Sequence, residues 1–263
     1  MLELPVPAVP VTRLPIALTE TSVLAVIPAR FQSTRLPGKA LADIAGRPMI
    51  EHVYRRAARA ASLDAVVIAT DDERIRQATE SFGGVAVMTS PQHGTGTDRL
   101  AEVAAAVPCD LIVNVQGDEP LLDPAVIDAV VEPMRRDPSI QMGTAARPLR
   151  HIDELTSPSV VKVVRDGRGF ALYFSRAPIP YGRDGSSGEL ARVHVGLYAY
   201  RRETLLRLAS LPTGRLEQLE ALEQLRALEN GIRILVVDTH FASAEVNTAE
   251  DLERVRQLIA KAD

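Results

Sequence analysis

The chain has 263 residues, of which 46% are hydrophobic and 24% are charged, and its formal net charge is −4 at pH 7. These values are typical of a globular protein with one large α/β domain, alone or with a smaller insertion. The negative charge and the lack of a long basic stripe argue against a general nucleic-acid binder. The single cysteine, Cys109, excludes an intramolecular disulfide and fits a reducing compartment. A small, semi-buried residue is a better interpretation of it than a catalytic thiol.

The N-terminal segment differs in composition from the rest of the chain, because it contains Pro5, Pro7, Pro10 and Pro15. Proline disfavours helix, so residues 1–21 are expected to form a flexible arm. No charged segment followed by an uninterrupted apolar stretch marks a signal peptide, and no apolar run is long enough to span a membrane. We therefore expect a cytoplasmic protein with no membrane partner.

The first half of the chain alternates between apolar runs and helical patterns. The runs are typical of buried strands and lie at residues 23–27, 65–70, 85–88 and 111–116. The helical patterns cover residues 48–61, 73–82 and 97–107, and a further helix begins at Asp123-Pro124. This alternation predicts an α/β fold with a Rossmann-like, mostly parallel, doubly wound sheet.

The second half has a different pattern. Two short apolar runs on either side of a glycine-containing turn predict a β-hairpin over residues 160–175. Further along we expect a strand at 193–200, a long helix at 216–229, a strand at 232–238 and a capped helix at 248–261. Residues 183–189 are rich in glycine and serine and are expected to form a mobile loop.

The most informative segment covers residues 26–39 and reads VIPARFQSTRLPGK. Arg30, Arg35 and Lys39 follow a predicted strand, and open α/β sheets bind ligands at the carboxyl ends of their strands. Arginine forks and a lysine ammonium can together neutralise a triphosphate. The segment is not a Walker A loop, because Gly38-Lys39 is followed by Ala40. The alternative is a solvated basic loop without a ligand.

Two other segments follow predicted strands. NVQGDEPLL, at residues 114–122, places Asp118 at the same sheet edge, where Mg²⁺ on a nucleotide takes one or two protein carboxylates. Gly117 before it lets a ligand approach the backbone closely. The alternative is that Asp118 only pairs with the nearby cations. HGTGTDR, at residues 93–99, lies at a helix N-terminus that could hold an anion or a base edge.

In this order, these segments resemble the 3-deoxy-manno-octulosonate (Kdo) cytidylyltransferases, also called CMP-Kdo synthetases. The later segments that share the resemblance are ALYFSRAPIPY, HVGLYAY, LEQLEALEQLR and NTAEDLERV, so it extends from about residue 23 to the C-terminus. It implies that CTP and Kdo react to give CMP-Kdo and pyrophosphate for lipopolysaccharide biosynthesis, with Mg²⁺ as cofactor. It also implies a nucleotidyltransferase domain over residues 22–263. Within it, an insertion at roughly 151–215 contributes a β-hairpin and helix to the sugar site and to a homodimer interface.

The resemblance also assigns roles to residues. It implies a catalytic set of Arg30, Lys39 and Asp118, and nucleotide contacts from Ala29, Arg30, Ser33, Arg35 and Lys39. The implied sugar-binding residues are Arg99, Gln116, Arg176, His194, Tyr198 and Glu217, and the implied metal ligands are Asp118 and Asn247. A core role for His194 remains an alternative. Tyr198 lies four residues further along the same predicted strand, so the two side chains should share a face.

One position departs from the family pattern. The closing motif normally has an aspartate that binds metal, whereas this chain has Asn247, which offers an oxygen without a charge. Weaker Mg²⁺ binding is expected, unless the substrate supplies enough charge or Glu245 or Asp238 takes the place of the aspartate. The alternative functions are transfer to a related acid sugar, such as 8-amino-Kdo or a sialic acid, and a non-catalytic nucleotide-binding role.

Overall fold

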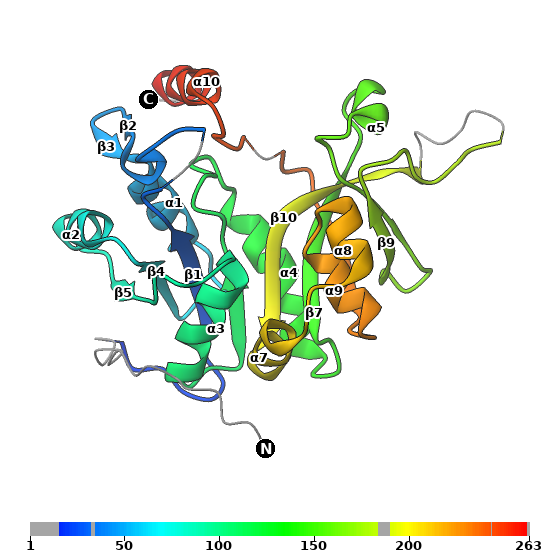
Figure 1. The fold of residues 1–263 in the computed structure, drawn as a ribbon, viewed down its shortest axis with the longest axis horizontal. Helices are drawn as coiled ribbons and strands as arrows, with labels where there is room; N and C mark the ends of the chain where they lie inside the picture. Colours follow the sequence, from blue (N-terminus) through cyan, green and yellow to red (C-terminus); the bar gives the residue numbers. More distant parts are fainter. Residues whose placement is uncertain (1–15, 33–34, 184–189, 243, 262–263) are drawn as a thin grey trace.

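The computed structural model describes residues 16–32, 35–183, 190–242 and 244–261 (Figure 1). Residues 1–15 of the predicted arm, Ser33, and residues 184–189 of the predicted loop lie outside this part. Among the described residues, nine strands form one sheet, in which seven follow the order β11-β7-β10-β6-β1-β4-β5. Strand β8 pairs with β10 and with β9.

The first half forms the parallel part of the sheet. Its strands are β1 (Val23–Ala29), β4 (Ala65–Thr70), β5 (Ala86–Met88) and β6 (Leu111–Asn114). Its helices are α1 (Met49–Ala57), α2 (Glu73–Ser81), α3 (Gly96–Ala106) and α4 (Pro124–Arg136). Side chains alternate across β1, so Ile27 packs in the cluster that contains α1 and α4, and Val26 packs in the cluster that contains α3. The predicted alternation of strands and helices is confirmed.

Short-range signals explain where these helices begin. Asp72 accepts a hydrogen bond from the backbone of Arg74 at the start of α2. Thr95 and Asp98 form a reciprocal capping box at the start of α3. Asp123 caps α4 ahead of Pro124, as the sequence predicts. The loops that follow the carboxyl ends of β4, β5 and β6 therefore each end at a capped helix.

The second half completes the sheet. Strand β10 (Arg192–Arg201) runs antiparallel to β6 and to β7 (Met142–Pro148), and β11 (Ile234–Asp238) pairs in parallel with β7. The predicted hairpin is confirmed as β8 (Lys162–Arg165) and β9 (Ala171–Ser175). The remaining elements are η1 (Lys39–Leu41), β2 (Asp43–Ile44), β3 (Arg47–Pro48), α5 (Asp153–Thr156), α7 (Arg202–Ser210) and α10 (Ala249–Ala260). The predicted α/β class is confirmed, and the antiparallel pairs of the large sheet all involve β10 or the β8–β9 hairpin.

The prediction of one long helix over residues 216–229 is wrong. The chain forms α8 (Arg215–Glu220) and α9 (Gln224–Glu229), separated by Ala221 in the left-handed conformation with φ 51° and ψ 50°. The break changes the direction of the chain, so that Leu222 is buried in the core whereas Leu219 is 81% exposed. A straight helix would have kept both leucines on one stripe.

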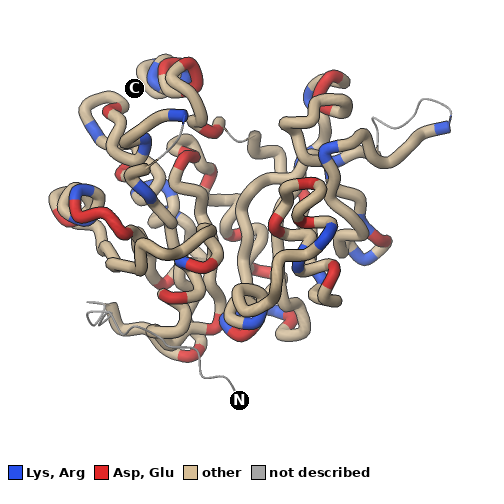
Figure 2. Tube along the Cα trace, in the orientation of Figure 1, with Lys and Arg blue, Asp and Glu red and all other residues tan. Residues whose placement is uncertain are grey.

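The surface of the described chain carries charges of both signs. Basic and acidic residues are interspersed along the tube (Figure 2). Within the described ranges, no helix has the length and apolarity needed to cross a membrane.

Candidate active site

The candidate site lies where the strand order reverses. From β1 the chain continues to β4 and β5 on one side of the sheet and then returns to β6 on the other side. Loops that leave the carboxyl ends of β1 and β6 therefore diverge, which opens a crevice between them. The two chain segments approach closely at its base, because a Cβ atom on Gly117 would lie 2.8 Å from the carbonyl oxygen of Pro28.

A cavity of about 350 Å³ occupies this crevice. Its lining includes five predicted nucleotide or metal residues, namely Ala29, Arg30, Arg35, Lys39 and Asp118, and the predicted sugar residue Gln116. The Lys39 ammonium forms an ion pair with the Asp118 carboxylate at 2.7 Å, and both side chains are about a fifth exposed, at 18% and 23%. The structure thus brings together the cations of one loop and the carboxylate of the next. The pairing of Asp118 with a cation also agrees with the alternative interpretation of that residue.

The C-terminal segment of the chain closes one side of the crevice. The backbone N–H of Val246 donates to the carbonyl oxygen of Asp118 at 2.9 Å. Asn247 uses both ends of its amide, because Oδ1 accepts from Arg35 at 3.0 Å and Nδ2 donates to Glu245 at 3.0 Å. Desolvation of the carboxylate, together with the nearby charge of Asp118, raises the pKa of Glu245. Asn247 is therefore next to the predicted metal-binding aspartate.

The two carboxylates considered as replacements for the missing aspartate are in different places. Glu245 is next to Asn247, as its hydrogen bond shows. Asp238 instead pairs with Arg165 at 2.7 Å on the β8 hairpin. Within the described part of the chain, no group of three or more His, Cys, Asp or Glu side chains is arranged to hold a metal ion. A magnesium site here would therefore need oxygens from a bound nucleotide in addition to protein ligands.

A second polar region lies on β10, next to the carboxyl end of β6. The rings of His194 and Tyr198 are 5.2 Å apart, which confirms that they share one face of the strand. The His194 ring is within hydrogen-bonding distance of the Thr144 hydroxyl at 3.1 Å, and burial lowers its pKa to about 3. Gln116 donates to the carbonyl oxygen of Gly196 at 3.1 Å and connects this region to the cavity. At neutral pH His194 is uncharged, so it can donate one hydrogen bond and accept another.

The same region contains buried polar atoms that form no hydrogen bond within the described chain. Asn114 Oδ1 and Gln224 Nε2 are two of them, and a third, Glu223 Oε1, has only the Arg226 guanidinium, 3.8 Å away. Burial and the charge of Glu223 raise the pKa of Tyr200 well above its usual value. Buried polar atoms of this kind usually bind a water molecule or a ligand.

Sequence reasoning missed Glu223 and Gln224 because the segment contains the triplet Leu-Glu-Gln twice. It assigned the first glutamate, Glu217, to the sugar. In the structure, Glu217 is buried in an ion pair with Arg226, with distances of 2.7 and 2.5 Å, at the start of the α8–α9 corner. The two triplets differ in the burial of their leucines. Leu222 of the second triplet is buried, so that triplet lies against the core.

Two other predicted sugar residues also have partners within the chain. Arg176 donates to the carbonyl oxygens of Glu220 at 2.7 Å and Pro158 at 2.9 Å. Arg99 is completely buried in α3. Direct contact of either guanidinium with a sugar therefore stays a prediction. Cys109 is 2% exposed and burial raises its pKa to about 11, in agreement with the expectation of a small buried residue.

Comparison with known proteins gives consistent matches over most of the chain. The family model described as cytidylyltransferase matches residues 24–234. A protein of Geobacter sulfurreducens named 3-deoxy-manno-octulosonate cytidylyltransferase is 54% identical over 89% of this chain and 98% of its own length. One of the same name from Syntrophotalea carbinolica is 56% identical over 89% of this chain and 97% of its own length.

Solved structures show the same relationship. The structure of CMP:2-keto-3-deoxy-manno-octonic acid synthetase complexed with CTP superposes with a TM-score of 0.89 at 45% identity, and the match covers 92% of this chain and all of the other. A 4-diphosphocytidyl-2C-methyl-D-erythritol synthase from Anaerococcus prevotii has a TM-score of 0.60 at 12% identity, over 92% of this chain and 99% of the other. At that identity the second match shows a shared fold only.

Proposed function

Because this chain belongs to the 3-deoxy-manno-octulosonate cytidylyltransferase family of nucleotidyltransferases, we propose that it transfers CMP from CTP to Kdo. One observation supports this function most directly. Arg30, Arg35, Lys39 and Asp118 line a single cavity at the strand-order reversal, in a chain that superposes closely on a relative complexed with CTP. The product would be CMP-Kdo, used in lipopolysaccharide biosynthesis.

The proposed reaction is a substitution at the α-phosphorus of CTP. The anomeric hydroxyl oxygen of the sugar forms a bond to phosphorus, the bond to the β-phosphate oxygen breaks, and pyrophosphate leaves while the hydroxyl proton is lost. Negative charge develops on the leaving pyrophosphate and on the α-phosphate oxygens. Arg30, Arg35 and Lys39 already face the cavity in which this charge would appear. Stabilisation by such preorganised cations is often the largest single contribution to catalysis.

Magnesium is the proposed cofactor, and the residues present fit it. The Asp118 carboxylate and the Asn247 amide oxygen are hard oxygen donors, one charged and one neutral. When bound, Mg²⁺ supplies positive charge to the phosphates and makes a coordinated hydroxyl easier to deprotonate. In the structure described here, Lys39 and Arg35 occupy these two acceptors. Both cations would have to share them or move toward the phosphates when nucleotide and metal bind.

The sugar is proposed to bind in the polar region on β10. Its hydroxyls would pair with Asn114 Oδ1, Glu223 Oε1 and Gln224 Nε2, which form no hydrogen bond within the described chain, and with neutral His194. This region lies next to the cavity, because Asn114 is at the end of β6 and pairs in register with Tyr198 of β10. The anomeric carbon would then face the triphosphate from the β10 side of the crevice.

A homodimer is also proposed. Among the described residues of the second half, the large apolar side chains that are more than half exposed are Ile152, Leu172, Tyr181, Leu190 and Leu219, at 66%, 63%, 87%, 71% and 81%. Exposed apolar residues that gather on one part of a surface indicate a protein interface. Light scattering after size exclusion tests this proposal, and a mass of 28.5 kDa, that of one chain, would contradict it.

The first experiment is pyrophosphate release with CTP and Mg²⁺, with Kdo, 8-amino-Kdo, N-acetylneuraminate or no sugar. Release that depends on Kdo supports the proposal. Release with another acid sugar alone would retain the mechanism and change the substrate. Measurable CTP binding without release with any sugar would instead support the non-catalytic alternative. Replacement of Asp118 by Ala should abolish turnover and preserve the fold, and a variant with near wild-type turnover would contradict the assigned metal role.

A further inference from the structure

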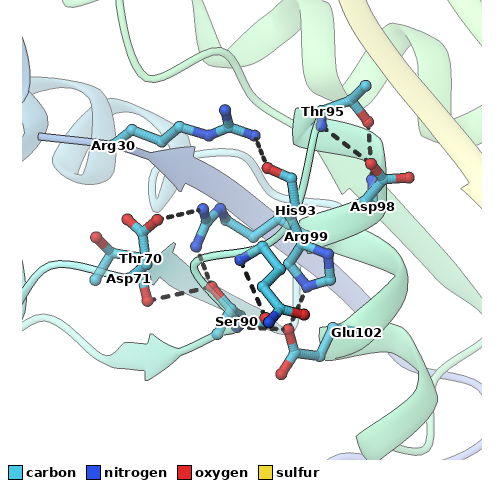
Figure 3. Close-up of polar contacts among 11 residues, drawn as sticks. Arg30, Thr70, Asp71, Ser90, His93, Thr95, Asp98, Arg99 and Glu102 are labelled. Atoms are coloured by element: carbon cyan, nitrogen blue, oxygen red, sulfur yellow. Dashed lines mark hydrogen bonds and ion pairs between the residues drawn. The ribbon is translucent and has the colours of Figure 1, made fainter. Parts of the chain in front are cut away.

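Helix α3 carries two charged residues, Arg99 and Glu102, that hold the loop between β5 and α3 (Figure 3). Arg99 is completely buried, and its guanidinium donates to the Asp71 carboxylate at 3.0 Å and to the Thr89 hydroxyl. Thr89 is the first residue of this loop, and Asp71 follows β4. Arg99 therefore fixes the start of the loop between β5 and α3 against the end of β4.

Glu102 holds the next part of that loop. One oxygen of its carboxylate, Oε2, accepts from the backbone N–H of Ser90 at 2.9 Å and is also hydrogen-bonded to Nε2 of the His93 ring. Only about a fifth of each side chain is exposed, 22% for Glu102 and 21% for His93. The carboxylate thus connects two points of the loop to one helix position and defines the path of the backbone between them.

The same loop provides the partner of Arg30. The backbone carbonyl oxygen of His93 accepts a hydrogen bond from Nη2 of Arg30 at 2.8 Å, and Figure 3 shows this contact on the opposite side of His93 from its ring. Arg30 is otherwise an exposed side chain on the cavity wall. An arginine side chain without a partner samples many rotamers and loses conformational entropy when it binds an anion. A fixed hydrogen-bond acceptor restricts the rotamers beforehand, so less entropy is lost on binding.

We propose that Glu102 is a positioning residue for Arg30 and acts through the backbone of His93. The carboxylate holds the His93 ring and Ser90, the loop presents the His93 carbonyl, and the carbonyl orients the Arg30 guanidinium toward the triphosphate. The inference depends on the proposed function in one respect only, which is that the anion bound by Arg30 is the triphosphate of CTP. The amide oxygen of a glutamine at position 102 can take the place of Oε2 and accept from both the Ser90 backbone and the His93 ring, so it should preserve the arrangement.

A double-mutant cycle tests the coupling. Glu102→Ala should lower kcat/KM for CTP about tenfold in the wild-type background, and by less than about twofold when Arg30 is already alanine. Glu102→Gln should stay within about threefold of wild type. The matched control is Glu132→Ala, which removes another helix glutamate with a surface arginine partner, and it should leave kcat/KM unchanged.

Two results would overturn the inference. Equal losses from Glu102→Ala in both backgrounds would mean that the residue acts on overall structure and not through Arg30. A folded Glu102→Ala variant with wild-type kcat/KM would mean that the contact has no role in positioning. If no sugar supports turnover, the proposed function fails separately. The same cycle is then measured by calorimetry of CTP binding, where the same coupling of about tenfold is expected.

Discussion

Gly117→Ala tests the geometry at the base of the crevice. An added Cβ would lie 2.8 Å from the backbone oxygen of Pro28, about 0.6 Å short of the 3.4 Å at which ordinary contact begins. Since the neighbouring atom belongs to the backbone of β1, one of the two chain segments must move. Overpacking of this kind costs about 1–3 kcal/mol. For a chain of this size, that corresponds to a fall in Tm of about 2–5 °C.

The same shift would displace Asp118, which follows Gly117. Misplacement by about 1 Å can cost on the order of 10²-fold in rate, so the smaller shift should lower kcat by about tenfold. The assays are calorimetric Tm and pyrophosphate release at saturating CTP and sugar. Gly96→Ala is the matched control, because its Cβ would meet the same proline, through the side chain, at an ordinary 3.5 Å. A Gly117→Ala variant with the Tm and kcat of the control would refute the reasoning.

Three further predictions concern charge. Asn247→Asp adds a second carboxylate to the cavity, so it should lower the Mg²⁺ concentration needed for half-maximal rate; an unchanged value would remove the idea that Asn247 limits metal affinity. Glu217→Ala removes the closer of two carboxylates from the buried Arg226 and should reduce the free energy of unfolding in urea by at most about 3–5 kcal/mol, whereas the surface control Glu253→Ala should change it little. The pKa of His194 falls from 6.5 to about 3 on folding, so the unfolded chain binds more protons between these values. The free energy of unfolding should therefore fall as the pH falls from about 6.5 toward 3, by up to about 1.4 kcal/mol per pH unit. His194→Gln should make this fall shallower, and urea titrations at several pH values would measure the difference.

The elements that sequence analysis predicted correctly have strong local signals. Strands β1, β4 and β6 are short runs of aliphatic residues, and helices α2, α3, α4 and α10 begin at residues with capping side chains. Strand β7 has no such signal, because it reads MGTAARP. Its small residues serve the packing of α4, since a Cβ on Gly143 would lie 3.0 Å from Met134 and from Val130. A tertiary contact of this kind leaves no local pattern to detect.

The residues of the candidate site also differ in whether a local sequence signal identifies them. The loop of Arg30, Arg35 and Lys39 could be identified because charge, turn residues and a strand end coincide within one segment. The sugar-binding candidates could be assigned only to segments, because the identical triplets at residues 216–218 and 222–224 lie on either side of the left-handed Ala221 and have different surroundings. This difference depends on the burial of Leu222, which results from packing in the whole core and not from the residues next to it in sequence.

Because of the antiparallel strand β10, the two candidate binding regions come from different parts of the chain, which is useful for engineering. The cations that line the cavity come from the segment that follows β1, whereas His194 and Tyr198 come from β10, and Glu223 and Gln224 come from the α8–α9 corner. A combinatorial library restricted to these last four positions would therefore change the proposed sugar region and leave the proposed nucleotide-binding segment as it is. Selection from such a library could redirect the activated nucleotide to acid sugars of other lengths, with a single scaffold as the donor platform.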